Sequence, residues 1–177
     1  MTEADKKKPQ RSTIWMWLAV AFVVSIAIGG WLLKPVSQEE KSLQADLQTI
    51  ITRQLGEKSN MDKKRIDSIS VSRVSESWDV ELALNADKGF TMVSTQQAMW
   101  QQSIDILGPL SEISQLNDIS ISWIYPVKDS SNDVKDENVM SFWMDKATRD
   151  QLIWDRVEPS ILPDIVFDYK EHAVLNK

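Results

Sequence analysis

The residues of this chain whose types could do chemistry are few and stand apart. Its one histidine, His172, follows Asp168 by four residues, a spacing that would place both on one face of a helix. An imidazole beside a carboxylate can act as a general base, but such a dyad also needs a nucleophile, which the sequence does not place. We therefore interpret the two residues as a surface contact.

Carboxylates also gather in the segment between Lys128 and Asn138, as Asp129, Asp133, Asp136 and Glu137. Calcium prefers several oxygen ligands at spaced positions, with a glycine where the loop turns sharply. This segment has no glycine and matches no known ligand spacing. It predicts a solvated hairpin loop, with weak calcium binding as the alternative.

The composition removes several classes of function. The chain has no cysteine, which excludes disulfides, zinc–thiolate sites and thiol nucleophiles. Its formal net charge of −6 argues against a nucleic-acid partner, because binding phosphates needs a basic surface. No glycine-rich phosphate loop, G-x-S-x-G elbow or H-E-x-x-H motif is written in it. We expect a protein without catalytic residues, metal or cofactor.

The N-terminal region carries a long apolar run. Residues 14–33 read IWMWLAVAFVVSIAIGGWLL, about 20 residues without a charge, which as a helix would cross a bilayer. Lysines and an arginine in residues 1–13 predict a cytoplasmic N-terminus and an extracytoplasmic C-terminal domain. Trp15, Trp17 and Trp31 stand where indoles anchor at a membrane interface. The run predicts a single-pass protein of the cell membrane, with a cleaved signal peptide as the alternative.

Residues 34–65 show a different periodicity. Ser37-Gln38-Glu39-Glu40 has the S-x-x-E form of a helix capping box. Five apolar residues follow at three-to-four spacing: Leu43, Leu47, Ile50, Ile51 and Leu55. They predict an amphipathic helix beside the membrane that ends at Gly56, before a polar linker at 57–65. The apolar stripe either packs on the following domain or pairs with a helix of another chain, so its five residues are interaction candidates.

Residues 66–177 predict a small α+β domain. Alternation indicates strands at 69–73 and 78–84, and Ile-Ser-Val-Ser at 69–72 recurs as Ile-Ser-Ile-Ser at 119–122. A second helix is expected from about Met92 to Leu107, with Gly108-Pro109 as its end, and a last strand at 139–144. The order helix–strand–strand therefore occurs twice. We expect four antiparallel strands with both helices on one face, a ferredoxin-like or permuted sandwich.

One short stretch, KGFTMV at 88–93, resembles the cleavage site of type IV prepilins, which are cut between Gly and Phe. A prepilin also has glutamate at the fifth position after the cut and a long apolar helix behind it. Here that position is Ser94, and Thr95-Gln96-Gln97 follows. We instead expect Gly89 to permit a turn, and Thr91 or Ser94 to cap the second helix.

The C-terminal part predicts a helical tail. Asp145 can cap a first segment, Pro159 and Pro163 interrupt the tail, and residues 165–173 suggest a last amphipathic helix. Four tryptophans fall at predicted buried positions, and we expect them to pack in the core: Trp78, Trp100, Trp123 and Trp143.

Two functions are compatible with these features. The first is a structural or interaction subunit of a membrane complex, whose partners are the bilayer and other membrane or envelope proteins, or further copies of itself. Its layout is similar in architecture to the inner-membrane platform subunits of type II secretion and type IV pilus machines. The alternative is a ligand-binding or sensory domain at the cell surface, with Trp78 or Trp123 exposed on an open sheet face.

Overall fold

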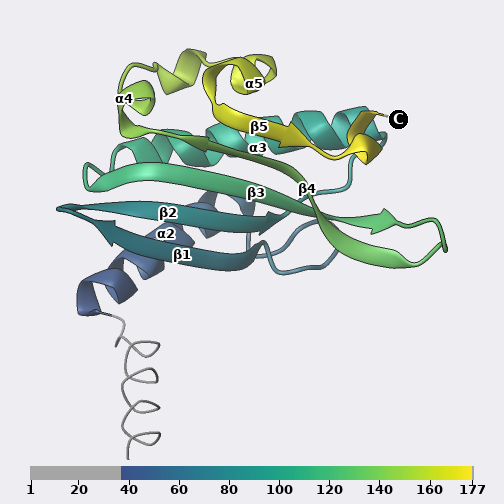
Figure 1. The fold of residues 1–177 in the computed structure, drawn as a ribbon, viewed down its shortest axis with the longest axis horizontal. Coiled ribbons are helices and arrows are strands. Elements are labelled where there is room, and N and C mark those ends of the chain that lie inside the picture. The colour runs from purple at the N-terminus through teal and green to yellow at the C-terminus, as the bar shows by residue number, and fades with distance from the viewer. Residues whose placement is uncertain (1–36, 177) are drawn as a thin grey trace, which may run out of the picture. The chain divides into compact units, whose positions relative to one another are not determined.

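A computed structural model describes residues 37–176 of the chain, and its elements are labelled in Figure 1. Its main elements are α2 (Gln38–Leu55), β1 (Ile66–Val74), β2 (Ser77–Asn85), α3 (Met92–Ser111), β3 (Leu116–Lys128), β4 (Val134–Met144), α4 (Lys146–Arg149), α5 (Leu162–Ile165) and β5 (Phe167–Glu171). Three short 3-10 turns complete the C-terminal part: η1 (Trp154–Arg156), η2 (Pro159–Ile161) and η3 (Ala173–Asn176).

The five strands form one mixed sheet in the order β1-β2-β3-β4-β5. β2 and β3 run parallel, whereas the other neighbouring pairs are antiparallel. The α+β class and the twofold succession of helix, strand and strand agree with the sequence. The expectation of four antiparallel strands was wrong. After β2, helix α3 returns the chain to the end of the sheet where β2 begins, so β3 runs beside β2 in the same direction. Since these two strands are neighbours, the split βαβ unit of ferredoxin-like folds is not formed either.

The core lies between one face of the sheet and the two long helices, which Figure 1 shows behind the strands. Leu82, Ile121 and Phe142 face one another across β2, β3 and β4, and all three are buried. The helices contribute these buried residues: Leu43, Leu47 and Ile51 from α2, and Met99, Ile106, Leu107 and Leu110 from α3. Removing this apolar surface from water is the main stabilising contribution to the fold.

Two tryptophans belong to this core. Trp78 is buried, and Trp123 is fully buried with its indole nitrogen donating to Ser103 Oγ at 2.9 Å. Ser103 in turn donates to the carbonyl of Met99, so the buried polar atoms of this group are satisfied. The placement of Trp78 or Trp123 on an open sheet face was therefore wrong.

The stretch that resembles a prepilin cleavage site is the start of α3. Thr91 is the N-cap residue, and its side chain accepts from the backbone N–H of Ser94, whose hydroxyl in turn accepts from the Thr91 N–H. The helical expectation is confirmed at this end. The helix does not stop at Gly108-Pro109, however, and continues to Ser111 with Pro109 in its last turn.

The expected helical tail was wrong in its main feature, because residues 167–171 form strand β5. Tyr169 of β5 accepts a hydrogen bond from the Trp100 indole at 2.6 Å and donates one to Glu171. The strand pairs with the edge of β4, and the hydrogen bond from Trp100 of α3 helps to hold it there. Asp145 does cap a helix, as expected, but α4 is a single turn.

The expectation of a single-pass membrane protein is corrected. Within residues 37–176, no helix is both long and apolar enough to span a bilayer. The two long helices are amphipathic: α2 carries acidic residues in its first turn and a basic residue in its last, and α3 has polar residues throughout. The run at 14–33, with Trp15, Trp17 and Trp31, and the tail at 1–13 lie outside the described residues. The expectations of a membrane location and of an extracytoplasmic C-terminal domain are corrected together with the single-pass expectation.

Candidate interaction surface

The face of the sheet away from α2 and α3 is lined by short hydroxyl side chains. Side chains alternate along a strand, so the residues between core positions point to this side. The strand register aligns them in two rows, one of Ser70, Glu81, Ser120 and Trp143, and one of Ser68, Ala83, Ser122 and Ser141. We call this surface the serine face and define it by Ser68, Ser70, Ser72, Ser120, Ser122 and Ser141.

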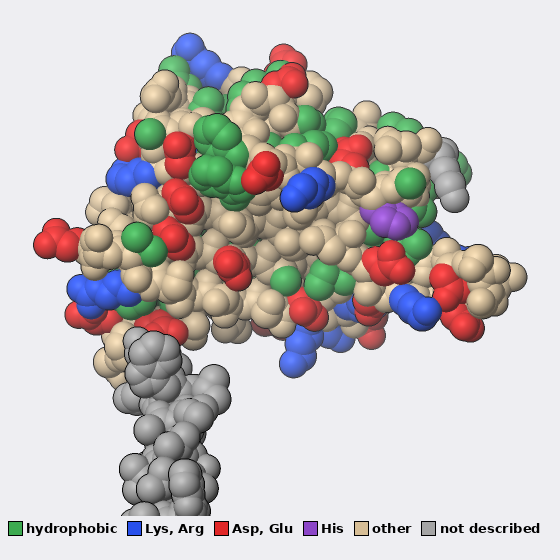
Figure 2. Space-filling model, viewed as in Figure 1, with side chains coloured by type: hydrophobic (Ala, Val, Ile, Leu, Met, Phe, Trp, Pro, Cys, Tyr) green, Lys and Arg blue, Asp and Glu red, His purple; other side chains and the backbone are tan. Residues whose placement is uncertain are grey.

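Figure 2 views the molecule from the same side as Figure 1 and shows the middle of this face in tan, the colour of uncharged polar side chains and backbone. Acidic side chains are scattered around it. The Ile-Ser echo in the sequence is the signal for this surface, because both copies send their serines to the same side of the sheet. Sequence reasoning noted the echo but did not predict the surface.

An aromatic pair borders the serine face. The rings of Trp143 on β4 and Phe167 on β5 are stacked, with centroids 4.6 Å apart and planes 26° from parallel. The Trp143 indole donates to Asp168 Oδ2 at 3.2 Å, and Phe167 is 41% exposed. Trp143 is thus a partly exposed surface residue and not the core residue that we expected. Exposed aromatic rings held in a fixed geometry are typical anchors of binding surfaces.

A depression of about 540 Å³ opens beside this pair. Its lining includes the Trp143 ring, the Asn117 amide, and the carboxylates of Asp118, Asp145 and Asp150. Burial, together with the nearby charges of Asp79 and Asp145, raises the pKa of Asp118. By contrast, hydrogen bonds from Thr148 hold the pKa of Asp145 below its usual value. Lys146 also lines the depression and pairs with Asp150 at 2.6 Å, so Asp118 and Asp145 carry the excess of negative charge beside the Trp143 ring.

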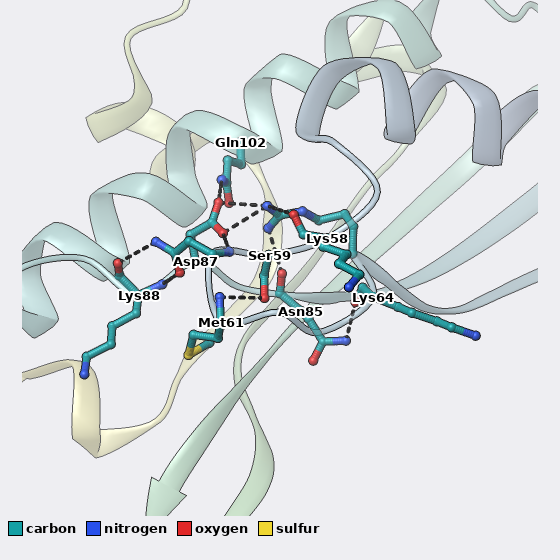
Figure 3. A network of polar contacts seen from close by, with 10 residues as sticks. Lys58, Ser59, Met61, Lys64, Asn85, Asp87, Lys88 and Gln102 are labelled. Carbon is teal, nitrogen blue, oxygen red and sulfur yellow. Dashed lines mark hydrogen bonds and ion pairs between the residues drawn. The ribbon is translucent and has the colours of Figure 1, made fainter.

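A second polar group, which we call the Arg65 clamp, consists of Asn60, Arg65, Asp87 and Gln102. Figure 3 shows its surroundings, with Asp87 and Gln102 labelled. The guanidinium of Arg65 is almost fully buried and pairs with Asp87 Oδ2 at 2.8 Å. It also donates to the carbonyl of Asn85 at 2.8 Å. The backbone N–H of Asn60 and the side chain of Gln102 on α3 donate to the same carboxylate.

The contacts of the Arg65 clamp stabilise the fold. Burial alone would raise the pKa of Asp87, but hydrogen bonds from Asn60, Gln102 and Arg65 and the Arg65 charge hold this pKa below its usual value. Both carboxylate oxygens are occupied by these donors. The clamp joins the segment after α2, the end of β2 and the middle of α3. It holds residues 57–65, which were expected to be a polar linker, against the domain.

The five interaction candidates of the first helix lie on the side of α2 that faces the domain. Leu43, Leu47 and Ile51 are buried in the core, and Ile50 and Leu55 are partly buried against it. The compact unit begins at Gln38 and includes this helix. In the structure the apolar stripe of α2 packs on the domain. Its pairing with a helix of another chain stays a prediction.

The remaining candidates are not brought together. His172 approaches Glu137 at 3.5 Å and not Asp168, because β5 replaces the expected helix. In the hairpin after β3, Asp129 accepts from the N–H groups of Ser131 and Asp133 and pairs with Lys135 at 2.9 Å. These contacts, the Lys135 bond first, lower the pKa of Asp129. Within residues 37–176, no group of three or more acidic or histidine side chains is arranged to hold a metal ion.

Comparison of the chain with family models, with curated proteins and with solved structures finds no match.

Proposed function

We propose that this protein is a structural or interaction protein, and not an enzyme, that binds a protein partner across its serine face. The observation that carries this proposal is the pairing of a broad face of short hydroxyl side chains with the exposed Trp143–Phe167 stack at its border.

The physical basis is the way protein interfaces divide their contacts. A few aromatic residues contribute most of the binding free energy, and surrounding contacts exclude water and supply hydrogen bonds. The Trp143–Phe167 stack has the chemistry of the first kind. The serines fit the second, because a short hydroxyl lets a partner come close and can both donate and accept.

The test uses the full chain with a photo-reactive amino acid at one position, expressed in its own cells. Position 122 lies on the serine face, and position 101 on the exposed flank of α3 is the matched control. We expect a discrete adduct with another protein from position 122 and none from position 101. Substitution of Phe167 with Ser should remove the adduct, because it removes half of the aromatic anchor while changing a residue that is already exposed.

Two outcomes would contradict the proposal. One is the absence of any adduct from positions 120 and 122 alike. The other is the same adducts from position 101, which would indicate random collision. A thermal melt of each variant shows whether a lost adduct reflects lost folding.

The second candidate is a ligand-binding or sensory domain, and the depression beside Trp143 favours it. Carboxylates next to an aromatic face suit a small organic cation, which can pair with the acids and lie over the ring. Titration with spermidine, followed by calorimetry, would support this candidate if binding disappears in Asp118→Asn. If the calorimeter records only the heat of dilution, this class of ligand is excluded.

A further inference from the structure

Strand β1 forms one end of the sheet. It pairs with β2 on its inner side, and no other strand of the described residues pairs with its outer side. At nine residues and without proline it is a long edge strand. Unpaired backbone groups along such an edge are a template for another strand, and natural proteins usually protect them.

The sequence of β1, IDSISVSRV, is nearly symmetric in chemistry about Ser70. Counting outwards from Ser70, similar or complementary residues stand at equal distances: Ile69 and Val71, Ser68 and Ser72, Asp67 and Arg73, and Ile66 and Val74. A strand with this property can pair with a copy of itself in the antiparallel direction, because each residue then lies opposite its counterpart.

We infer that β1 pairs with β1 of a second copy of this chain, antiparallel and with a twofold axis at Ser70. A bulge between Ile66 and Ser68 displaces Asp67 from the regular strand pairing, and Arg73 pairs with Glu39 of its own chain at 3.0 Å in an exposed contact. In this register Asp67 of each copy comes near Arg73 of the other, so each Arg73 can exchange Glu39 for Asp67 at the ends of the shared segment. Ser68 lies opposite Ser72, and Ile69 opposite Val71. The two sheets become one continuous sheet of ten strands.

The charges of β1 favour this register over protection of the edge. Charges that protect an edge repel a second copy, whereas Asp67 and Arg73 have opposite signs and stand symmetrically about the centre. A shift of one residue in either direction would place Ser70 opposite Ile69 or Val71. It would then mix the serine rows with the apolar rows and separate the two opposite charges.

The flank of α2 leaves room for the second copy. A twofold axis perpendicular to the sheet brings the two α2 helices near each other on the same side. The edge between α2 and the start of β1 is hollowed by a depression of about 370 Å³, lined in part by Gln48, Thr52 and Ile66. A second depression of about 460 Å³ continues along the helix over Ala45, Thr49 and Thr52. The short side chains of Ala45, Thr49 and Thr52 allow the helices to approach, and the longer Gln48 and Arg53 line the same depression.

This inference concerns the edge of the sheet and holds whether or not the serine face binds a partner. Its most direct test uses the absence of cysteine from the chain. In Ser70→Cys, the two thiols would lie opposite each other at the axis, where opposed Cβ atoms are about 4.5–5.5 Å apart, close enough for a disulfide after a small adjustment. We expect the full chain to form a covalent dimer on mild oxidation.

Ser72→Cys is the matched control, because it lies on the same face of the same strand. Its two thiols would be four residues apart along the paired strands, about 13 Å, which is too far for a disulfide. Equal cross-linking of both variants would overturn the register. The absence of cross-linking in Ser70→Cys would overturn the pairing.

A charge exchange provides an independent test by sedimentation of the full chain. Asp67→Arg places like charges opposite each other twice, so we expect the dimer to weaken by about tenfold or more. The double variant Asp67→Arg with Arg73→Asp should restore it, whereas Glu112→Arg, an exposed change away from the edge, should have no effect. A monomeric wild type at up to about 1 mM, or a double variant that stays monomeric, would contradict the proposal.

Discussion

Two neighbouring residues of β4 illustrate how one step along a strand divides core from surface. Phe142 is buried and stacks on Tyr169 at 6.4 Å, whereas Trp143 points to the other side and stacks on the partly exposed Phe167. Both are aromatic, and their types alone do not distinguish their roles. The alternation of the strand places one side chain in the core and the other on the surface.

At the same scale, the Arg65 clamp predicts how the free energy of unfolding depends on pH. Asp87→Asn removes one charge of an ion pair whose other member is buried, and should lower the free energy of unfolding by about 2–3 kcal/mol at neutral pH. Because folding lowers the pKa of Asp87 below 3.8, its contribution is complete above that value and is lost as the pH falls through the folded-state pKa. Urea melts should therefore show the stabilities of wild type and Asp87→Asn converging as the pH falls below 3.8, and a pH-independent difference would contradict this account.

Gly89 is the second residue with a specific consequence. A Cβ at this position would lie 2.5 Å from the backbone nitrogen of Thr95, which the helix holds in place. Gly89→Ala should therefore destabilise the protein by about 1–3 kcal/mol, because the start of α3 has to move. Thermal melts measure the change, and Lys88→Ala, an exposed neighbour in the same loop, should differ from wild type by less than about 0.5 kcal/mol.

At the scale of elements, the sequence predicted which face of a strand is buried. It did not predict the relative direction of neighbouring strands or every strand of the sheet. Alternation located most of β1 and β2 and part of β3, an apolar run located the second half of β4, and the cap at Thr91 located the start of α3. The first residues of β4, from Val134 to Asn138, were instead expected to be loop. Alternation could not report that β2 and β3 run parallel, because it is the same in both directions. β5 was missed because five residues have little pattern of their own and depend on β4 and Trp100. The surface pair Trp143–Phe167 depends on that missed strand.

The same limit applies to α2, whose apolar stripe fits a domain or a partner equally well in sequence. Leu47 is fully buried, so Leu47→Ala should lower the free energy of unfolding by about 2–5 kcal/mol. Gln48→Ala, one residue further on the exposed side of the helix, should have little effect. Chemical denaturation of the full chain measures both. A stable Leu47→Ala variant that loses association would indicate that the stripe serves another chain.

At the scale of the whole domain, the serine face and the β1 edge are compatible with each other. A twofold axis perpendicular to the sheet leaves both serine faces on the same side of the joined sheet. A dimer would then present two copies of the face, and a partner with repeated sites would bind it more tightly than a monomer. The two proposals therefore describe separate contacts that can act together.

The separation of these contacts can be measured by hydrogen exchange on the full chain. Pairing of β1 with a second copy protects backbone amides that point outwards from the edge, so exchange in residues 66–74 should slow as the protein concentration rises. Exchange in β5, which forms the opposite edge, should not depend on concentration.

Asp67→Arg should abolish the dependence in β1, because the like charges separate the strands. Phe167→Ser should leave it unchanged, since Phe167 lies on the face and not on this edge. If Phe167→Ser removed the dependence instead, the copies would meet through their serine faces and β1 would stay unpaired.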